Sequence, residues 1–175
     1  MAVNGLQIRP LQDGDDLHAL TALLHRAYAA LALRGLNYTA VDQTVETTRG
    51  RIAQGQCLVA EHTGRLVGTV LYTRRIDPCE ATLFTQVASI HQFAVEPALQ
   101  GQGIGLELIR AAEAIALSHG EPALALDTAE QADHLIAAYQ RWGFGIVGHV
   151  QWPGKVYRSV LMLKALEPYA HPPRA

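Results

Sequence analysis

The chain has 175 residues, of which 49% are apolar, so it is long enough for one domain with its own core. Its formal net charge is −2, without any block of like charge, which argues against a nucleic-acid-binding face. No apolar run approaches the ~18 residues of a membrane-spanning helix, and the N-terminus lacks the pattern of a signal peptide. Two isolated cysteines, Cys57 and Cys79, form no disulfide framework, which fits a reducing cytoplasm. Together these features lead us to expect a cytoplasmic protein without nucleic-acid or membrane partners.

In the N-terminal half, apolar periodicity predicts both strands and helices. Alternation predicts a short first strand, and apolar residues three and four apart predict a helix that follows a turn at Asp13 to Asp15. A second helix, with polar residues that look exposed, and a hairpin with a Thr63-Gly64 turn come next. The predicted elements are a strand at 6–10, helices at 17–31 and 41–54, hairpin strands at 57–62 and 66–74, and one long or broken strand within 82–95.

In the C-terminal half, a helix is predicted at 103–119 and a strand, buried on both faces, at 124–127. Thr128 and Gln131 have the spacing of a capping box, which predicts that the next helix starts there and ends at Gly143. Strands at 144–150 and 157–163 complete the order β-α-α-β-β-β-α-β-α-β-β. This order predicts an α/β (α+β) fold with helices on both faces of a sheet, as a single domain at 1–166 with a proline-rich tail at 167–175.

A glycine-rich turn between a strand and a helix is the most informative stretch. Residues 95–105 read Val-Glu-Pro-Ala-Leu-Gln-Gly-Gln-Gly-Ile-Gly, and such turns hold phosphates because glycine permits close approach and a helix N-terminus has free N–H groups. The dinucleotide fingerprint would need glycine where Leu106 stands, and the Gly-Lys-Ser/Thr of the P-loop is absent. A nucleotide-binding fold of dinucleotide type is therefore disfavoured.

Two motifs resemble those of the GNAT superfamily of N-acetyltransferases. Gln100, Gly103 and Gly105 fit the superfamily's coenzyme A pyrophosphate loop, and Tyr139 to Phe144 resembles its Tyr-x-x-x-Gly-Phe motif about 35 residues later. The predicted order of elements is also the GNAT order, which implies a mixed, mostly antiparallel sheet of about 6–7 strands. One departure is Ala132, where many members have an asparagine that contacts the cofactor.

The resemblance implies that the chain uses acetyl-CoA. The loop amides would hold the pyrophosphate, and the main chain of the preceding strand would pair with the pantetheine arm, with an N–H of Phe93 or Val95 polarising the thioester carbonyl. The implied cofactor-binding residues are Phe93, Ala94, Val95, Gln100, Gly101, Gln102, Gly103, Ile104 and Gly105.

Acetylation of an amine also requires a base and an acid. His91 is the favoured general base, because it lies on the strand face of Phe93 and has an ordinary pKa of about 6.5. Histidine on this strand resembles the arylalkylamine N-acetyltransferases. Glu96 is the rival base and Glu61 a weaker one, and Tyr139 is the expected general acid for the departing thiolate. Each could instead be a structural residue.

The resemblance places the acceptor pocket between the first two helices and the last hairpin. Aromatic walls there suit an apolar or aromatic amine. The expected acceptor is a small-molecule amine or a peptide amine, and no metal is expected. GNAT members often form homodimers, although no pattern in this chain specifies one. A non-catalytic acyl-CoA-binding sensor or regulatory domain of the same fold is the alternative function. The candidate acceptor residues are Tyr28, Tyr38, Trp152 and Tyr157.

Overall fold

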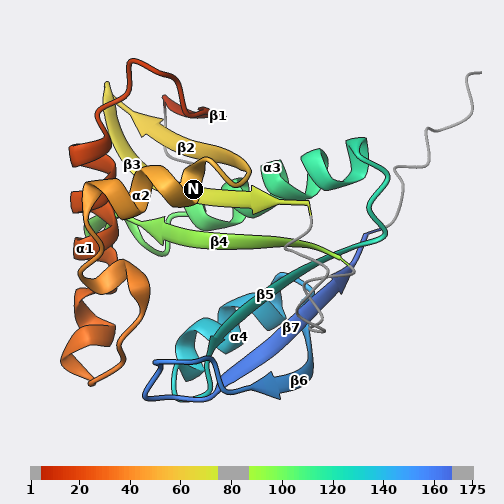
Figure 1. Cartoon of the computed structure of the whole chain (residues 1–175). Helices are drawn as coiled ribbons and strands as arrows, with labels where there is room; N and C mark the ends of the chain where they lie inside the picture. The colour runs from red at the N-terminus through yellow and green to blue at the C-terminus, as the bar shows by residue number, and fades with distance from the viewer. Residues whose placement is uncertain (1–4, 75–86, 167–175) are drawn as a thin grey trace, which may run out of the picture.

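The computed structural model describes residues 5–74 and 87–166 (Figure 1). Its elements follow the predicted order of strands and helices. They are β1 (Leu6–Pro10), α1 (Leu17–Leu33), the 3-10 helix η1 (Thr39–Val41), α2 (Val45–Ile52), β2 (Gln56–His62), β3 (Arg65–Thr73), β4 (Ala88–Val95), the 3-10 helix η3 (Pro97–Leu99), α3 (Ile104–Ser118), β5 (Ala123–Ala129), α4 (Asp133–Arg141), β6 (Gly145–Val150) and β7 (Ser159–Ala165).

The strands form one seven-stranded sheet in the order β1-β2-β3-β4-β5-β7-β6. Every neighbouring pair is antiparallel except β4 and β5, which are parallel. The predicted fold class, a mixed and mostly antiparallel sheet of about six or seven strands, is therefore confirmed. Within the described residues, no helix is both long and apolar enough to cross a membrane.

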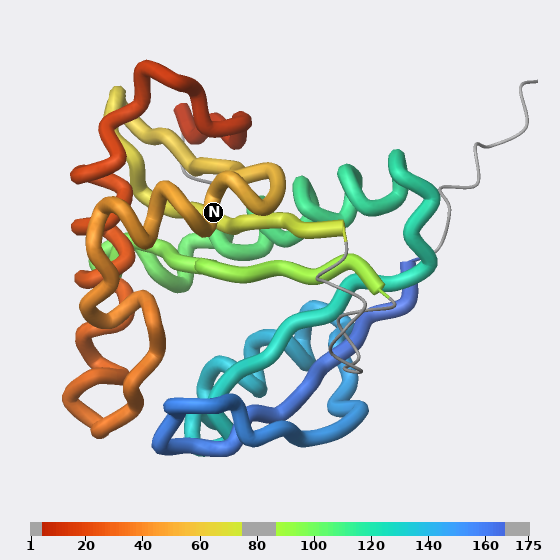
Figure 2. The backbone as a smooth tube through the Cα atoms, in the orientation of Figure 1, coloured from red at the N-terminus to blue at the C-terminus, as the bar shows by residue number. Residues whose placement is uncertain are grey.

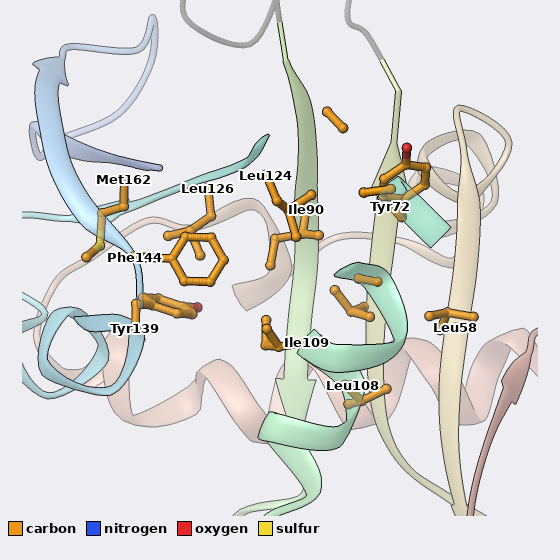
Figure 3. Close-up of a cluster of buried hydrophobic side chains, with 14 of the residues drawn as sticks. Leu58, Tyr72, Ile90, Leu108, Ile109, Leu124, Leu126, Tyr139, Phe144 and Met162 are labelled. Carbon is orange, nitrogen blue, oxygen red and sulfur yellow. The ribbon is translucent and has the colours of Figure 1, made fainter. Parts of the chain in front are cut away.

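Helices cover both faces of the sheet because the strands alternate apolar side chains between the faces. In β2, Leu58 and Ala60 pack in the cluster that contains Leu108 and Ile109 of α3 (Figure 3). Cys57 and Val59, the intervening residues, pack instead with Leu20 and Leu23 of α1. α4 joins the α3 side of the sheet through Tyr139.

A bulge in β4 separates the two parallel strands. Gln92 has a φ of +48°, and between the pairs Thr69–Ala94 and Leu71–His91 two residues of β4 oppose one of β3. β4 and β5 pair only at Ala88–Leu124 and Ser89–Ala125. Figure 2 shows the green β4 and the teal β5 close together at one end and well apart at the other. The sheet is therefore open between the C-terminal ends of β4 and β5.

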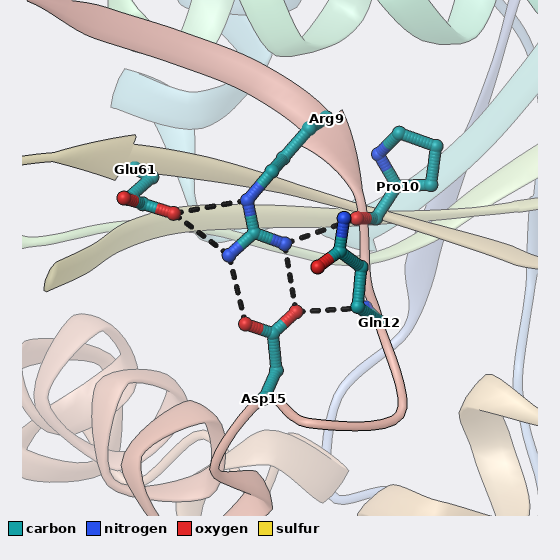
Figure 4. A network of polar contacts seen from close by, with 5 residues as sticks. All are labelled: Arg9, Pro10, Gln12, Asp15 and Glu61. Carbon is teal, nitrogen blue, oxygen red and sulfur yellow. Dashed lines mark hydrogen bonds and ion pairs between the residues drawn. The ribbon is translucent and has the colours of Figure 1, made fainter. Parts of the chain in front are cut away.

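A partly buried ionic cluster fastens the N-terminal strand to α1 and β2 (Figure 4). The Arg9 guanidinium donates to both carboxylate oxygens of Asp15 at 2.7 Å, and to Glu61 Oε2 at 2.7 and 2.9 Å. Asp15 also accepts from the Gln12 N–H at 2.7 Å. Because Asp15 precedes α1, this cluster fixes where the helix begins relative to the sheet.

The capping-box prediction was wrong. Thr128 lies inside β5, where its buried hydroxyl is bound to the Tyr38 hydroxyl at 2.9 Å, and Ala132 precedes α4 without a side-chain cap. Tertiary packing of the strand overrides the local capping signal. The second predicted helix is shorter than expected, because residues 39–41 form η1 and Thr44 caps α2 by accepting from the Thr47 N–H. The predicted tail, Cys79 and the start of the long strand at 82–86 lie outside the described residues.

The Arg9 cluster makes a pH-dependent contribution to stability. Its guanidinium holds the pKa of Asp15 below the usual range, mainly through their hydrogen bonds. We expect Asp15→Asn to lower the free energy of unfolding at pH 7 by about 1–3 kcal/mol. The stabilisation is complete above the unfolded pKa of about 3.9 and disappears as pH falls through the folded value, so variant and wild type should converge in strong acid. Urea unfolding of both proteins at several pH values measures this difference in the free energy of unfolding. Asp13→Asn is the control, because Asp13 is an exposed residue of the same turn.

Candidate active site

The glycine-rich turn is open to solvent and its amides are unused. Gly101 and Gly103 have φ values of +77° and +88°, and residues 101–103 are exposed. Gly103 immediately precedes α3. Within the described parts of the chain, the N–H groups of residues 101–106 donate to no other group. The turn thus presents consecutive free donors at a helix N-terminus, an arrangement that binds anions.

The turn is closely packed against the aromatic side chains behind it. A Cβ added to Gly105 would lie 3.0 Å from Phe93 Cζ and 3.2 Å from Trp142 Cη2, so a larger residue would force these rings to move. The Gln100 amide donates to the Val95 carbonyl oxygen at 3.1 Å. These contacts fix the turn against the end of β4.

The main chain of β4 faces the opening in the sheet. The Glu96 N–H donates to Val67 O of β3, and because main-chain groups alternate along a strand, those of Val95 face away from β3. The Tyr28 hydroxyl of α1 donates to Phe93 O from that side at 3.0 Å. The carbonyl of Phe93 and the main-chain groups of Val95 therefore point toward the space that β5 has left.

A pocket of about 170 Å³ lies beside these main-chain groups. It brings together residues from α1, α2, β4, β5, α4 and the β6–β7 connection. All four aromatic residues predicted for the acceptor pocket line it, and so do two of the three predicted catalytic residues. These are Tyr28, Tyr38, Trp152 and Tyr157, with His91 and Tyr139.

The aromatic walls are held by one another and by the sheet. The Tyr38 ring is 5.3 Å from that of Tyr28 and 4.9 Å from that of Tyr157, measured between centroids. The Tyr38 hydroxyl accepts from the Ala129 N–H at 2.8 Å and contacts the hydroxyl of Thr128. Because the hydroxyls of Tyr28 and Tyr38 bind protein groups, these residues contribute ring surface to the pocket.

His91 lies in the pocket as a neutral imidazole. Its Nε2 is 2.8 Å from Ser89 Oγ, which in turn is 2.9 Å from Thr73 Oγ1. Burial, and next the positive charge of Arg51, lower the pKa of His91 to about 4. The imidazole can therefore accept a proton at neutral pH, although it is a weaker base than an exposed histidine.

Tyr139 projects from α4 into a group of aromatic rings. Its ring centroid is 6.1 Å from Phe93, 5.8 Å from Trp142 and 6.1 Å from Phe144. Burial raises the pKa of Tyr139 well above its usual range, so the phenol keeps its proton. It can donate a hydrogen bond to an anionic group at the pocket.

The other candidate groups lie elsewhere. Glu96 is bound to Arg26 of α1, with Arg26 Nη2 at 2.7 Å from Glu96 Oε2, and is not among the described residues that line the pocket. Glu61 belongs to the Arg9 cluster. Cys57 is buried 3.4 Å from Thr69 Oγ1, and burial raises the pKa of its thiol, which favours the protonated form.

Three charged residues of the pocket were missed at the level of sequence: Arg51, Asp127 and Lys155. The interpretation of Arg51 as an exposed helix residue was wrong, since its half-buried side chain lines the pocket. Asp127 ends the strand predicted at 124–127 and lies inside the observed β5, where a charge among buried residues was a usable signal. Its carboxylate accepts from Trp152 Nε1 at 3.0 Å, and burial raises its pKa. Nothing in the local pattern distinguished Lys155.

The depressed pKa of His91 predicts an acid-sensitive stability. Between pH 6.5 and about 4, the unfolded chain binds a proton at His91 that the folded chain does not, so stability falls as pH falls through this window. We expect this to cost on the order of 2–3 kcal/mol, and His91→Gln to remove that part of the pH dependence. Urea unfolding of both proteins at about pH 6.5 and 4.5 measures it. Parallel losses in the two proteins would contradict the assignment.

Comparisons with known proteins agree with this geometry. A family model for the GNAT acetyltransferases matches residues 18–144, whereas no curated protein matches the chain. Solved structures share the fold at low sequence identity. A GNAT family acetyltransferase from Elizabethkingia anophelis with acetyl-CoA bound is 18% identical, covering 94% of this chain and 100% of that chain, with a TM-score of 0.67.

Two more structures extend the likeness. The ribosomal-protein-S18-alanine N-acetyltransferase from Escherichia coli is 17% identical, covering 97% of this chain and 99% of its own, with a TM-score of 0.70. An acetyltransferase from Streptococcus agalactiae is 18% identical, covering 94% of this chain and 100% of that chain, with a TM-score of 0.73. The family model spans most of the chain and the fold agrees with it. The protein thus belongs to the GNAT family of acetyltransferases.

Proposed function

We propose that this acetyltransferase transfers the acetyl group of acetyl-CoA to the nitrogen of a primary amine, by direct attack and without a covalent enzyme intermediate. The observation that carries this proposal is that three features lie next to one another: unused amides at residues 101–106, outward-facing main-chain groups on β4, and a pocket with His91 and Tyr139. They match, in order, a pyrophosphate, a thioester arm and an acceptor.

The residues present fit acetyl-CoA. The free N–H groups before α3 would hold the pyrophosphate, and the positive end of the helix dipole adds to the attraction. The main chain of Phe93, Ala94 and Val95 would pair with the pantetheine arm as a neighbouring strand does. When bound, acetyl-CoA supplies a thioester whose acyl carbon is open to attack. An N–H of Phe93 or Val95 would stabilise the charge that develops on the carbonyl oxygen.

His91 would take the proton of the attacking nitrogen. A free primary amine has a pKa of about 10.4, far above that of His91, so the imidazole cannot hold the proton of a free ammonium group. The nitrogen becomes much more acidic as its bond to carbon forms, and at that stage a neutral imidazole is a competent acceptor. Asp127 offers a negative charge that attracts the ammonium form into the pocket, where its first proton would leave to solvent before the neutral nitrogen attacks.

Tyr139 would stabilise the departing thiolate. Its buried phenol remains protonated and can donate to the sulfur. A thiol has an ordinary pKa of about 8.5, so the thiolate is a fair leaving group, and Tyr139 assists the departure without being indispensable. We also place the protein in the cytoplasm, where a free buried thiol such as Cys57 stays reduced.

The proposal predicts thiol release from acetyl-CoA that depends on an added amine. We expect Tyr139→Phe to lower kcat by about 10- to 100-fold, because the proton donor is lost while the ring remains. Tyr72→Phe is the matched control, since the Tyr72 hydroxyl is bound to His119 Nδ1 at 3.2 Å, away from the pocket. Binding of acetyl-CoA without thiol release over a broad amine panel would instead favour the sensor.

The phosphate loop can be tested separately from turnover. Gly103→Ala should weaken acetyl-CoA binding by about 5- to 30-fold, because an alanine at a φ of +88° is strained by ~1–2 kcal/mol and the loop would rearrange. Calorimetric titration measures the Kd. Gly14→Ala is the control, because Gly14 lies in an exposed turn, lacks a positive φ and has open space around its Cβ position. Equal affinities in the two variants would contradict the assigned loop.

A further inference from the structure

Arg51 has a side chain that the mechanism above does not use. It comes from α2 and lines the pocket, and its guanidinium has a single hydrogen bond, from Nη1 to Gln43 Oε1 at 3.1 Å. No carboxylate of the described residues lies within 4.0 Å of it. Because a guanidinium has five donors, most of its capacity is available to the pocket.

A buried polar network holds this guanidinium in place. The Gln43 amide nitrogen donates to Gln92 Oε1 and to Thr48 Oγ1, both at 2.7 Å. Both of its hydrogens are thereby used, so the amide oxygen is left to accept from Arg51. Thr48 is fixed in turn by Thr21 of α1, with their hydroxyls 2.8 Å apart. Arg51 is therefore positioned by α1, α2 and the bulge of β4 together.

Among the described residues, no carboxylate is close enough to form an ion pair with the guanidinium, and Asp127 acts on it only from a greater distance. Burial lowers the pKa of Arg51, which is the expected effect of removing a cation from water without an ion-pair partner. A half-buried charge of this kind is costly unless a ligand or partner neutralises it. Its place in a pocket makes a ligand the natural counter-ion.

The pocket as a whole has an excess of positive charge, although the chain has a net charge of −2. Arg51 and Lys155 are cations and Asp127 is the single carboxylate among its described lining residues. Lys155 already donates to Asn37 O at 2.8 Å and Thr39 Oγ1 at 3.0 Å. An amine without an anionic group would bind as a cation and would increase the positive charge that the pocket already has. An acceptor with its own anion would balance it.

We infer that the acceptor is a small amine that also carries a carboxylate, as a free amino acid does, with the carboxylate bound by Arg51 and the ammonium group toward Asp127. A planar guanidinium suits a carboxylate because two parallel N–H···O bonds can form. A volume of about 170 Å³ is below that of pockets for drug-sized ligands, which favours a single amino acid over a peptide. This inference rests on the proposed N-acetylation and specifies its substrate class.

The test compares acceptors that differ only in the carboxylate. Each free amino acid is paired with its decarboxylated amine, its amide and its aminophosphonate analogue, and kcat/KM is measured for each by thiol release. We expect the amino acid to be preferred over its decarboxylated amine by about 10- to 100-fold, the range for hydrogen bonds to charged groups. In Arg51→Met that preference ratio should fall by the same factor, mainly through KM, and Arg51→Lys should recover part of it.

Arg49→Met is the matched control, because Arg49 is an exposed arginine on the same helix, and it should keep the preference ratio. A wild type that prefers decarboxylated amines, amides, phosphonates or peptide termini would overturn the inference. An equal loss toward all acceptors in Arg51→Met would overturn it too. Those outcomes leave the N-acetylation intact.

A binding measurement keeps the inference testable without turnover. Trp152 lines the pocket, so its fluorescence can report the binding of an amino acid to the protein saturated with coenzyme A, which has no acetyl group to transfer. Amino acid binding that Arg51→Met weakens by about 10-fold or more, and Arg49→Met does not, would support the carboxylate site even if the proposed catalysis failed. Equal binding of an amino acid and its decarboxylated amine would refute it.

Discussion

The separation of β4 from β5 is the constraint on which the rest of the site depends. Two parallel strands that stayed paired would have used the carbonyl of Phe93 and the main-chain groups of Val95 inside the sheet. The bulge at Gln92 turns the strand away after two paired residues, so these groups face an open space instead. The glycine turn continues from the end of β4, and the pocket lies beside the same strand. The single bulge in β4 thus positions both the glycine turn and the pocket relative to the strand.

Much of this arrangement could be predicted from the sequence. The loop motif and the Tyr139 to Phe144 motif identified the family, because glycine at a positive φ and glycine under an aromatic ring leave a direct trace in the residue types. The four aromatic residues predicted for the acceptor pocket also line one pocket in the structure. Their individual roles remain proposals.

The charged residues of the pocket could not be predicted in the same way. Arg51 lies on a short helix whose one buried residue is Thr48, so the apolar pattern gave its orientation no support. The network that directs it joins residues 21, 43, 48 and 92, which are distant in the sequence. The capping box at Thr128 failed for a related reason, since a long-range contact with Tyr38 decided the fate of that hydroxyl. Local patterns report local energies, and these positions are set by long-range contacts.

The amide of Gln43 has one more consequence. It touches Arg51 on one side and the bulge residue Gln92 on the other, so the proposed acceptor anchor and the donor-binding strand share a single group. A ligand that shifts either neighbour alters the hydrogen bonding of the other. Thermodynamic linkage then requires each ligand to change the affinity of its counterpart by an equal factor. The affinities for donor and acceptor would therefore be coupled through the Gln43 side chain, which is not among the described residues that line the pocket.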